Sequence, residues 1–207
     1  MLKAYYCRVA GDPPTVPEAL LSSYRKEKLD VQTAPSARRE SVFSELLLCC
    51  ALCDSGFQID GPLEISEGEH GKPFLTGREV FFNLSHSSDM LLCALSDCEV
   101  GADVQIRSEA KLPLMERFFA EDERAYVLSA QDTDDAFTEI WTEKESWIKR
   151  CGLGLALPLR SFSVLDKNIA PLLAHRGEGE YHLSVCGEAV REGAIEWIEV
   201  KEDALLG

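Results

Sequence analysis

The sequence contains no run of the roughly 20 apolar residues that a membrane-spanning helix requires. Its opening residues, Met-Leu-Lys-Ala-Tyr-Tyr, also lack the apolar stretch of a secretory signal peptide, so we expect a cytoplasmic protein. Basic residues are scarce too: 21 Lys and Arg stand against 36 Asp and Glu, a net charge of −15. An acidic chain of this kind lacks the general basic face that nucleic-acid binding needs.

The eight cysteines raise the question of a small disulfide-bonded scaffold. However, 207 residues with 45% hydrophobic content are enough to build a real core, as one larger domain or two small ones. We therefore expect the cysteines to be reduced. Cys49, Cys50 and Cys53 lie in an apolar run, where cysteine packs as a small hydrophobic residue, and we expect no metal there.

One stretch departs from the acidic character of the chain. Residues 25–39 hold five basic side chains against two acidic ones, a local balance of +3. A phosphate-binding site in this protein must be local, and this stretch is its candidate. The alternative is a solvated loop followed by the start of a helix.

Hydrophobic periodicity predicts alternating strands and helices. Strands are expected at residues 2–9, 80–84, 90–95, 99–106, 161–165, 181–185 and 195–200. Helices are expected from near Pro17 and at 36–53, 115–128 and 136–150. This order predicts an α+β fold of two similar halves that meet near residues 100–105.

The strand at 99–106 alternates, so that Asp103 and Gln105 share the face opposite its apolar residues. A carboxylate in the middle of such a strand is costly to bury without a partner. Asp103 therefore needs a cation or a hydrogen-bond donor, unless this face of an edge strand is open to water.

Glu145 borders the apolar stripe of the helix at 136–150, and Lys149 follows it one turn later. The two could form an ordinary helix salt bridge, which contributes a few tenths of a kcal/mol, about 0.2–0.5. If Asp103 and Glu145 instead face each other, they provide two hard oxygen ligands suited to magnesium, with substrate phosphates completing its coordination.

Two shorter motifs are weak when taken alone. Asn83-Leu84-Ser85-His86-Ser87 places a hydroxyl and an imidazole at a strand end, and Gly71-Lys72-Pro73 places a cation beside a flexible residue. Both could be plain turns. The ordered set is far more specific, because it resembles the 4'-phosphopantetheinyl transferases, in particular the larger monomeric class that activates surfactin-type peptide synthetases. The resemblance runs through residues 71–73, 82–87, 100–104, 117–119, 123, 141–149, 152–155, 157–159 and 161–164.

The resemblance implies two α/β halves related by a pseudo-twofold axis, residues 1–100 and 101–207, with coenzyme A in the cleft between them. It implies that Asp103 and Glu145 bind Mg²⁺ or Mn²⁺. Many members carry a glutamate as third metal ligand where this chain has Gln105, which brings an amide oxygen but no charge. The coenzyme A contacts that it implies are Arg25, Lys28, Ser41, Lys72, Pro73, Ser85, His86, Lys144 and Lys149.

The implied reaction transfers phosphopantetheine from coenzyme A to a serine of an apo acyl or peptidyl carrier protein of peptide or polyketide biosynthesis. Asp103, Glu145 and Lys149 would be the catalytic residues, with Glu145 or a metal-bound water as the base. Two alternatives remain open: a non-catalytic module that binds coenzyme A or a carrier, and a metal-dependent nucleotide hydrolase. We expect a monomer whose C-terminal half docks the carrier through apolar side chains between Leu112 and Phe119, unless Phe118 and Phe119 are both buried.

Overall fold

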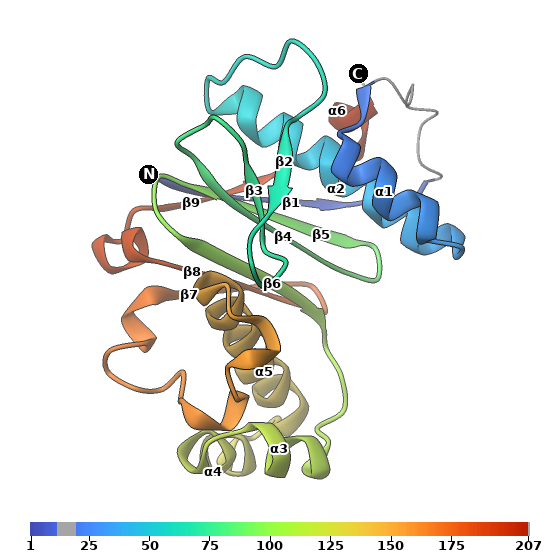
Figure 1. Cartoon of the computed structure of the whole chain (residues 1–207). Coiled ribbons are helices and arrows are strands. Elements are labelled where there is room, and N and C mark those ends of the chain that lie inside the picture. The colour runs from blue at the N-terminus through green and yellow to red at the C-terminus, as the bar shows by residue number, and fades with distance from the viewer. Residues whose placement is uncertain (12–19, 207) are drawn as a thin grey trace.

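The computed structural model describes residues 1–11 and 20–206. Its first sheet has the strand order β4-β5-β1-β9, in which β1 is antiparallel to β5 and parallel to β9. The bounds are Leu2–Arg8 (β1), Phe81–Ser87 (β4), Met90–Ser96 (β5) and Ile195–Glu199 (β9). Helices α1 (Ser23–Val31) and α2 (Pro35–Asp54) lie on one side of this sheet, with the hairpin β2 (Ile65–Glu67) and β3 (Pro73–Leu75) beside them (Figure 1).

Helix α2 forms because its apolar residues recur at helical spacing. Phe43, Leu47, Leu48 and Ala51 are buried, and they share a core cluster with alternate residues of β1 and β5. The other alternate residues of these strands, such as Tyr6 and Leu92, point to the opposite face of the sheet.

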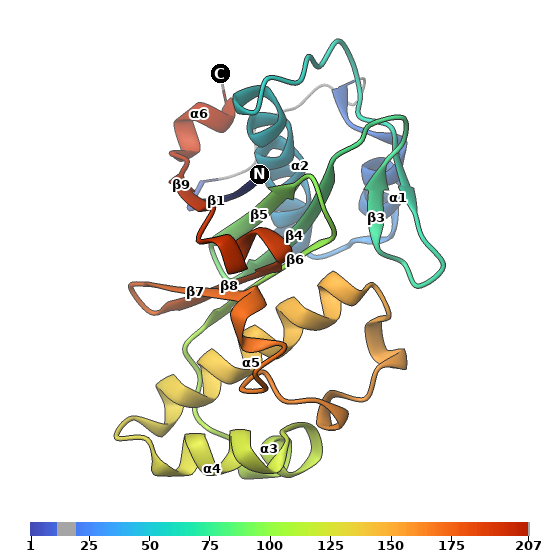
Figure 2. The same ribbon diagram turned by 90° about the vertical axis from the view of Figure 1, so that its left-hand side faces the viewer.

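A second sheet covers that opposite face, with the strand order β6-β8-β7. Its strands are Val100–Ile106 (β6), Leu173–Glu178 (β7) and Tyr181–Gly187 (β8). Val100, Ala102 and Val104 are fully buried in the core between the two sheets. The predicted alternation is therefore correct, and Asp103 points away from this core, toward helix α5 (Thr133–Cys151), which packs on the outer face of β6 and β8 (Figure 2).

Helices α3 (Leu112–Phe118) and α4 (Glu121–Ser129) form a third cluster with α5. We expected one helix over 115–128, but the chain is extended at Phe119 and Ala120, and the Ala120 N–H donates to Glu123 Oε2 at 2.8 Å. The strand expected at 161–165 does not form either. Val164 N–H donates to Glu123 Oε1 at 2.8 Å and not to a neighbouring strand.

The structure combines helices and sheets as predicted. After the second sheet, however, the last part of the chain goes back to the first sheet. Strand β9 and helix α6 (Glu202–Leu206) return to the first sheet, beside β1 and α2. The helix start expected near Pro17 lies outside the described residues, and α1 begins at Ser23 with Ser22 as its cap. None of the helices in the described ranges is long and apolar enough to cross a membrane.

Candidate active site

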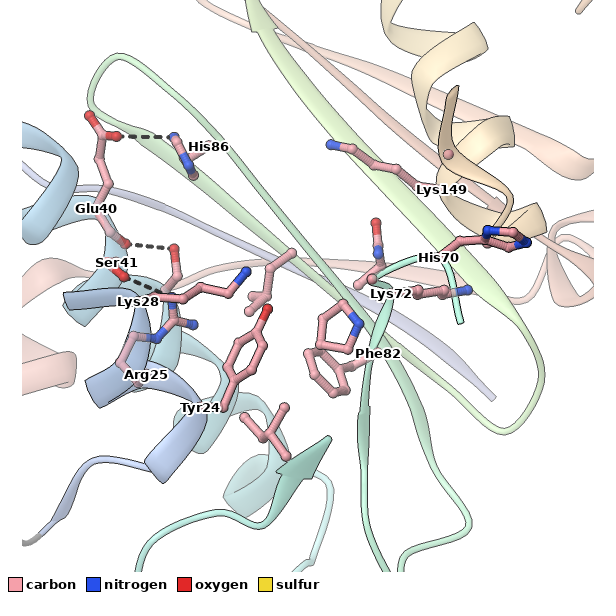
Figure 3. Close-up of a pocket in the computed structure, with 18 of the residues that line it drawn as sticks. Tyr24, Arg25, Lys28, Glu40, Ser41, His70, Lys72, Phe82, His86 and Lys149 are labelled. Carbon is pink, nitrogen blue, oxygen red and sulfur yellow. Dashed lines mark hydrogen bonds and ion pairs between the residues drawn. The ribbon is translucent and has the colours of Figure 1, made fainter. Parts of the chain in front are cut away.

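A cavity of about 540 Å³ lies between α1 and α2 on one side and α5 on the other (Figure 3). Lys149 reaches into it from α5, opposite Arg25, Lys28 and Ser41. Its lining includes Tyr24, Arg25, Lys28, Glu40, Ser41, His70, Lys72, Pro73, Phe82, His86, Glu145 and Lys149. The cavity thus brings together residues from positions 24 to 159 of the chain.

Asp103 lies beside the cavity and is 2% exposed. Its Oδ1 accepts hydrogen bonds from Ser85 Oγ at 2.8 Å and from Lys149 Nζ at 2.5 Å, and its Oδ2 accepts one from Gln105 Nε2 at 2.9 Å. The carboxylate therefore has the cation and the donors that its burial demands. It is not open to water on an edge strand.

Glu145 comes to the same place from α5, where it lines the cavity. Burial raises the pKa of its carboxyl, and the negative charge of Asp103 raises that pKa further, while Lys149 partly offsets the shift. The two carboxylates therefore interact across the contact between β6 and α5. Glu145 and Lys149 do not form the ordinary helix salt bridge that their spacing allows, because the Lys149 ammonium pairs with Asp103.

The donor set of this site fits a hard divalent cation. Asp103 is buried and Glu145 is half-buried, and the single ammonium of Lys149 pairs with Asp103. Among the described residues no three His, Cys, Asp or Glu side chains gather as a metal cluster. Magnesium commonly uses only one or two carboxylates together with substrate phosphates and water, so a sparse site suits it.

Gln105 lies at the edge of this site. Its amide nitrogen donates to Asp103, and its side chain borders a separate hollow of about 130 Å³. It thereby orients Asp103, and its amide oxygen is the atom that could serve a metal.

The basic residues of the stretch 25–39 differ in their exposure to solvent. Arg25 is 6% exposed, and its guanidinium binds Glu45 at 3.1 Å and Ser41 Oγ at 2.9 Å. Lys28 remains accessible, with its ammonium 4.6 Å from the Tyr24 ring centre and 3.3 Å from Glu67. Arg25, Lys28 and Ser41, which the resemblance implies as coenzyme A contacts, all line the cavity.

His86 and Lys72 line the cavity as well, and each has an acidic neighbour. His86 Nδ1 lies 3.2 Å from Glu40 Oε2. Lys72 Nζ donates to Glu99 at 2.6 Å and to the carbonyl oxygens of Val100 and Arg150 at 3.0 and 3.1 Å. Lys72 thus ties the last turn of α5 to the start of β6.

Two expected coenzyme A contacts have hydrogen-bond partners inside the protein. Lys144 is 0% exposed, and its ammonium donates to both Glu123 oxygens, at 2.8 and 2.6 Å, and to the Phe162 carbonyl at 2.8 Å. Ser85 is 6% exposed, lies outside the cavity lining and binds Asp103. Lys144 faces inward because it lies on the α5 stripe that packs on α4, which the helical periodicity could have indicated.

Sequence reasoning missed several lining residues, of which three have polar or aromatic side chains that bear on the site. Tyr24 lies beside the basic side chains of α1, Glu40 pairs with His86, and His70 precedes the Gly-Lys-Pro motif. Tyr24 carried a signal, because it is an aromatic residue among charged ones on a short helix. Glu40 carried none, because its partner is distant in the sequence.

Comparison with known proteins gives one consistent result. A family profile described as the 4'-phosphopantetheinyl transferase superfamily matches residues 99–195. A 4'-phosphopantetheinyl transferase of Bacillus subtilis is 33% identical over 159 residues, which cover 68% of this chain and 70% of that protein. The chain therefore belongs to the 4'-phosphopantetheinyl transferase superfamily.

Two further relatives match over a shorter span. The 4'-phosphopantetheinyl transferase gsp of Aneurinibacillus migulanus is 41% identical over 104 residues, 49% of this chain and 43% of that protein. The 4'-phosphopantetheinyl transferase Sfp of Bacillus subtilis (strain 168) is 38% identical over 113 residues, 52% of this chain and 50% of that protein. These matches confirm the resemblance to the Sfp-like class, and they span about half the length of these relatives.

Proposed function

We propose that this protein transfers 4'-phosphopantetheine from coenzyme A to a serine of an apo acyl or peptidyl carrier protein. The observation that carries the proposal is the constellation of Asp103, Glu145 and Lys149 at one end of the cavity, in a chain of this superfamily. Basic groups at the other end of the same cavity suit a second phosphate.

Coenzyme A would lie along the cavity. Arg25, Lys28 and His86 would face its 3'-phosphate, and Ser41 would add a hydroxyl. Tyr24, Pro73 and Phe82 offer apolar surface for a flat ring. The pyrophosphate would then reach Lys149, whose ammonium already lies beside Asp103.

Asp103 and Glu145 would hold Mg²⁺ or Mn²⁺, with the amide oxygen of Gln105 or water in addition. Bound there, the cation would neutralise the pyrophosphate and polarise its phosphorus–oxygen bonds. Because Gln105 carries no charge, the metal affinity should be lower than with a third carboxylate. Gln105→Glu should therefore lower the magnesium concentration that transfer needs.

Glu145 and Lys149 would have separate roles in the transfer. Glu145, which lines the cavity beside Lys149, accepts the proton of the carrier serine. The serine oxygen forms a bond to the β-phosphorus, and the bond from that phosphorus to the bridging oxygen breaks. The electron pair leaves with adenosine 3',5'-bisphosphate, and Lys149 offsets its growing charge.

The two halves of the chain would have different roles in this reaction. Residues 1–100 would bind the 3'-phosphate side of coenzyme A, and residues 101–207 would bind the metal and the carrier. The two halves would be related by a pseudo-twofold axis. The protein would act as a monomer in the cytoplasm.

The test is incubation of the protein with coenzyme A, magnesium and an apo carrier protein, followed by mass spectrometry of the carrier. We expect a mass gain of one phosphopantetheine. Asp103→Asn and Glu145→Gln should lower the rate by orders of magnitude while leaving the circular dichroism spectrum unchanged.

Other outcomes of this assay point to other functions. Free phosphopantetheine without carrier modification would indicate a hydrolase. Binding of coenzyme A without any reaction across a panel of apo acyl and peptidyl carriers would indicate a binding module. The same panel would identify the carrier that is served.

A further inference from the structure

The two sheets are joined at the active site by side chains. Strands β4 and β6 belong to different sheets, but three alternate residues of β4 accept backbone N–H groups of three alternate residues of β6. Ala102 N–H donates to Asn83 Oδ1 at 2.8 Å, Val104 N–H to Ser85 Oγ at 3.3 Å, and Ile106 N–H to Ser87 Oγ at 3.0 Å. We call these three contacts the side-chain ladder.

The side-chain ladder satisfies backbone groups that would otherwise be left without partners. An edge strand has unpaired N–H groups, and leaving them buried without an acceptor is costly. The ladder also fixes the register of β6 against β4, because each rung joins one residue to one residue. It therefore locates Asp103, which lies between two of the rungs, relative to the first sheet.

Ser85 is the middle rung and the one that contacts the metal-binding carboxylate. A hydroxyl offers one donor and two acceptor positions. Ser85 Oγ donates to Asp103 Oδ1 at 2.8 Å and accepts from Val104 N and from Lys149 Nζ at 3.0 Å. All three positions are in use within the protein, so one hydroxyl holds both the Asp103 carboxylate and the Lys149 ammonium.

We propose that Ser85 is a positioning residue for Asp103 and Lys149, and that it acts on metal binding. This inference rests on the proposed function, because it assumes that Asp103 binds the metal. Ser85 fixes one carboxylate oxygen of Asp103, the same oxygen that Lys149 contacts. Partners of a metal ligand of this kind typically change metal affinity about 10–100-fold when they are removed.

Ser87 provides a matched control. Ser85→Ala and Ser87→Ala each remove one hydroxyl and one rung of the ladder, but only Ser85 touches Asp103. The experiment is calorimetric titration of Mn²⁺ into each protein with saturating coenzyme A and no carrier, together with coenzyme A titration in EDTA. A melting curve of each variant reports the loss of a rung.

We expect Ser85→Ala to weaken Mn²⁺ binding about tenfold and Ser87→Ala to leave it unchanged, and the coenzyme A titration in EDTA sets the concentration that saturates each variant. Ser85→Cys keeps the side-chain size but weakens the donor, and it replaces Ser85→Ala if that variant does not fold. Equal Mn²⁺ affinity in the Ser85 and Ser87 variants would overturn the inference. Failure of the unaltered protein to bind Mn²⁺ would instead contradict the proposed function.

Discussion

Two lysines on α5 have different roles, because Lys144 lies in the interior and Lys149 lies at the cavity. The Lys144 ammonium is buried against Glu123 and lies 4.2 Å from the Phe162 ring centre. The Lys149 side chain is 29% exposed, and its ammonium meets Asp103 at the cavity. Both lysines belong to one short motif, and in the sequence only the helical periodicity separates them.

We expect Lys144→Ala to lower the free energy of unfolding by about 3–5 kcal/mol, because it leaves the Glu123 carboxylate buried without its cation. Lys149→Ala should cost less stability, because water can reach that site, but should remove most of the transfer activity. Urea unfolding and transfer rates of the two variants check this contrast. Equal stability of both variants would contradict it.

A second residue-scale prediction concerns Glu143. Burial raises the pKa of its carboxyl to about 8, and the carboxylates of Glu139 and Glu123 add to the shift. Since the folded pKa is raised above the unfolded value, folding loses stability as pH rises toward 8 and then levels off. The ionised form of Glu143 thus lowers the free energy of unfolding at high pH.

Glu143→Gln removes the ionisable carboxyl. It should therefore raise the melting temperature at pH 9 by a few degrees, given roughly 2–4 °C per kcal/mol for a domain of this size. At pH 4, where Glu143 is mostly protonated in both states, the variant and the unaltered protein should melt nearly alike. Melting curves across this pH range measure the difference. A gain that is the same at both pH values would show that charge is not the cause.

At the scale of elements, the contact between α5 and β6 carries the site, because Glu145 and Lys149 come from one and Asp103 from the other. Gly101 makes this contact close. A Cβ atom added there would lie 2.0 Å from the Ser146 carbonyl oxygen and 2.3 Å from the Arg150 nitrogen. Backbone atoms of a helix cannot yield to such a contact without moving the helix.

Gly101→Ala should therefore push α5 away from β6, with a stability loss larger than about 3 kcal/mol, beyond the usual range of point substitutions. It should also remove transfer activity. Gly177 on β7 is the matched control, because a Cβ atom there meets nothing within 4 Å. Denaturant unfolding of both variants tests this, and a stable, active Gly101→Ala protein would disprove the close packing.

At the scale of the whole molecule, the net charge of −15 shapes the proposed encounter with a carrier protein. Carrier proteins are generally acidic, so long-range attraction cannot bring the two together, and apolar contact is the alternative. The structure changes which residues could make it. Met115 and Phe119 are 1% and 0% exposed, whereas Leu112 is 57% and Leu128 61% exposed beside a shared hollow.

We therefore expect Leu112→Asp to raise the KM for the carrier several-fold while coenzyme A binding stays normal. Added salt should leave carrier affinity unchanged or improve it, because screening weakens the repulsion between two acidic proteins. Carrier kinetics at several salt concentrations measure both effects. A steep loss of affinity with salt would indicate attraction through local charges instead.

Much of this molecule follows from local patterns in the sequence. The alternation in β6 and the helical spacing in α2 and α5 predicted those elements, because a buried face imposes its period on the sequence. Strand β7 was missed because its residues are only partly buried and its pattern is polar. The break between α3 and α4 was missed because Glu123 caps it through a backbone contact that leaves no apolar signature.

The sequence by itself determined the chemical groups of the site, because Asp103, Glu145 and Lys149 stand in motifs that resemble one family. It could not determine which of the motif residues face the cavity. Ser85 and Lys144 became internal partners because Asp103 and Glu123 come from other elements of the chain. Only the packing of α5 and β4 against β6 decides those pairings, since a buried charge takes as partner whichever group the tertiary structure brings to it.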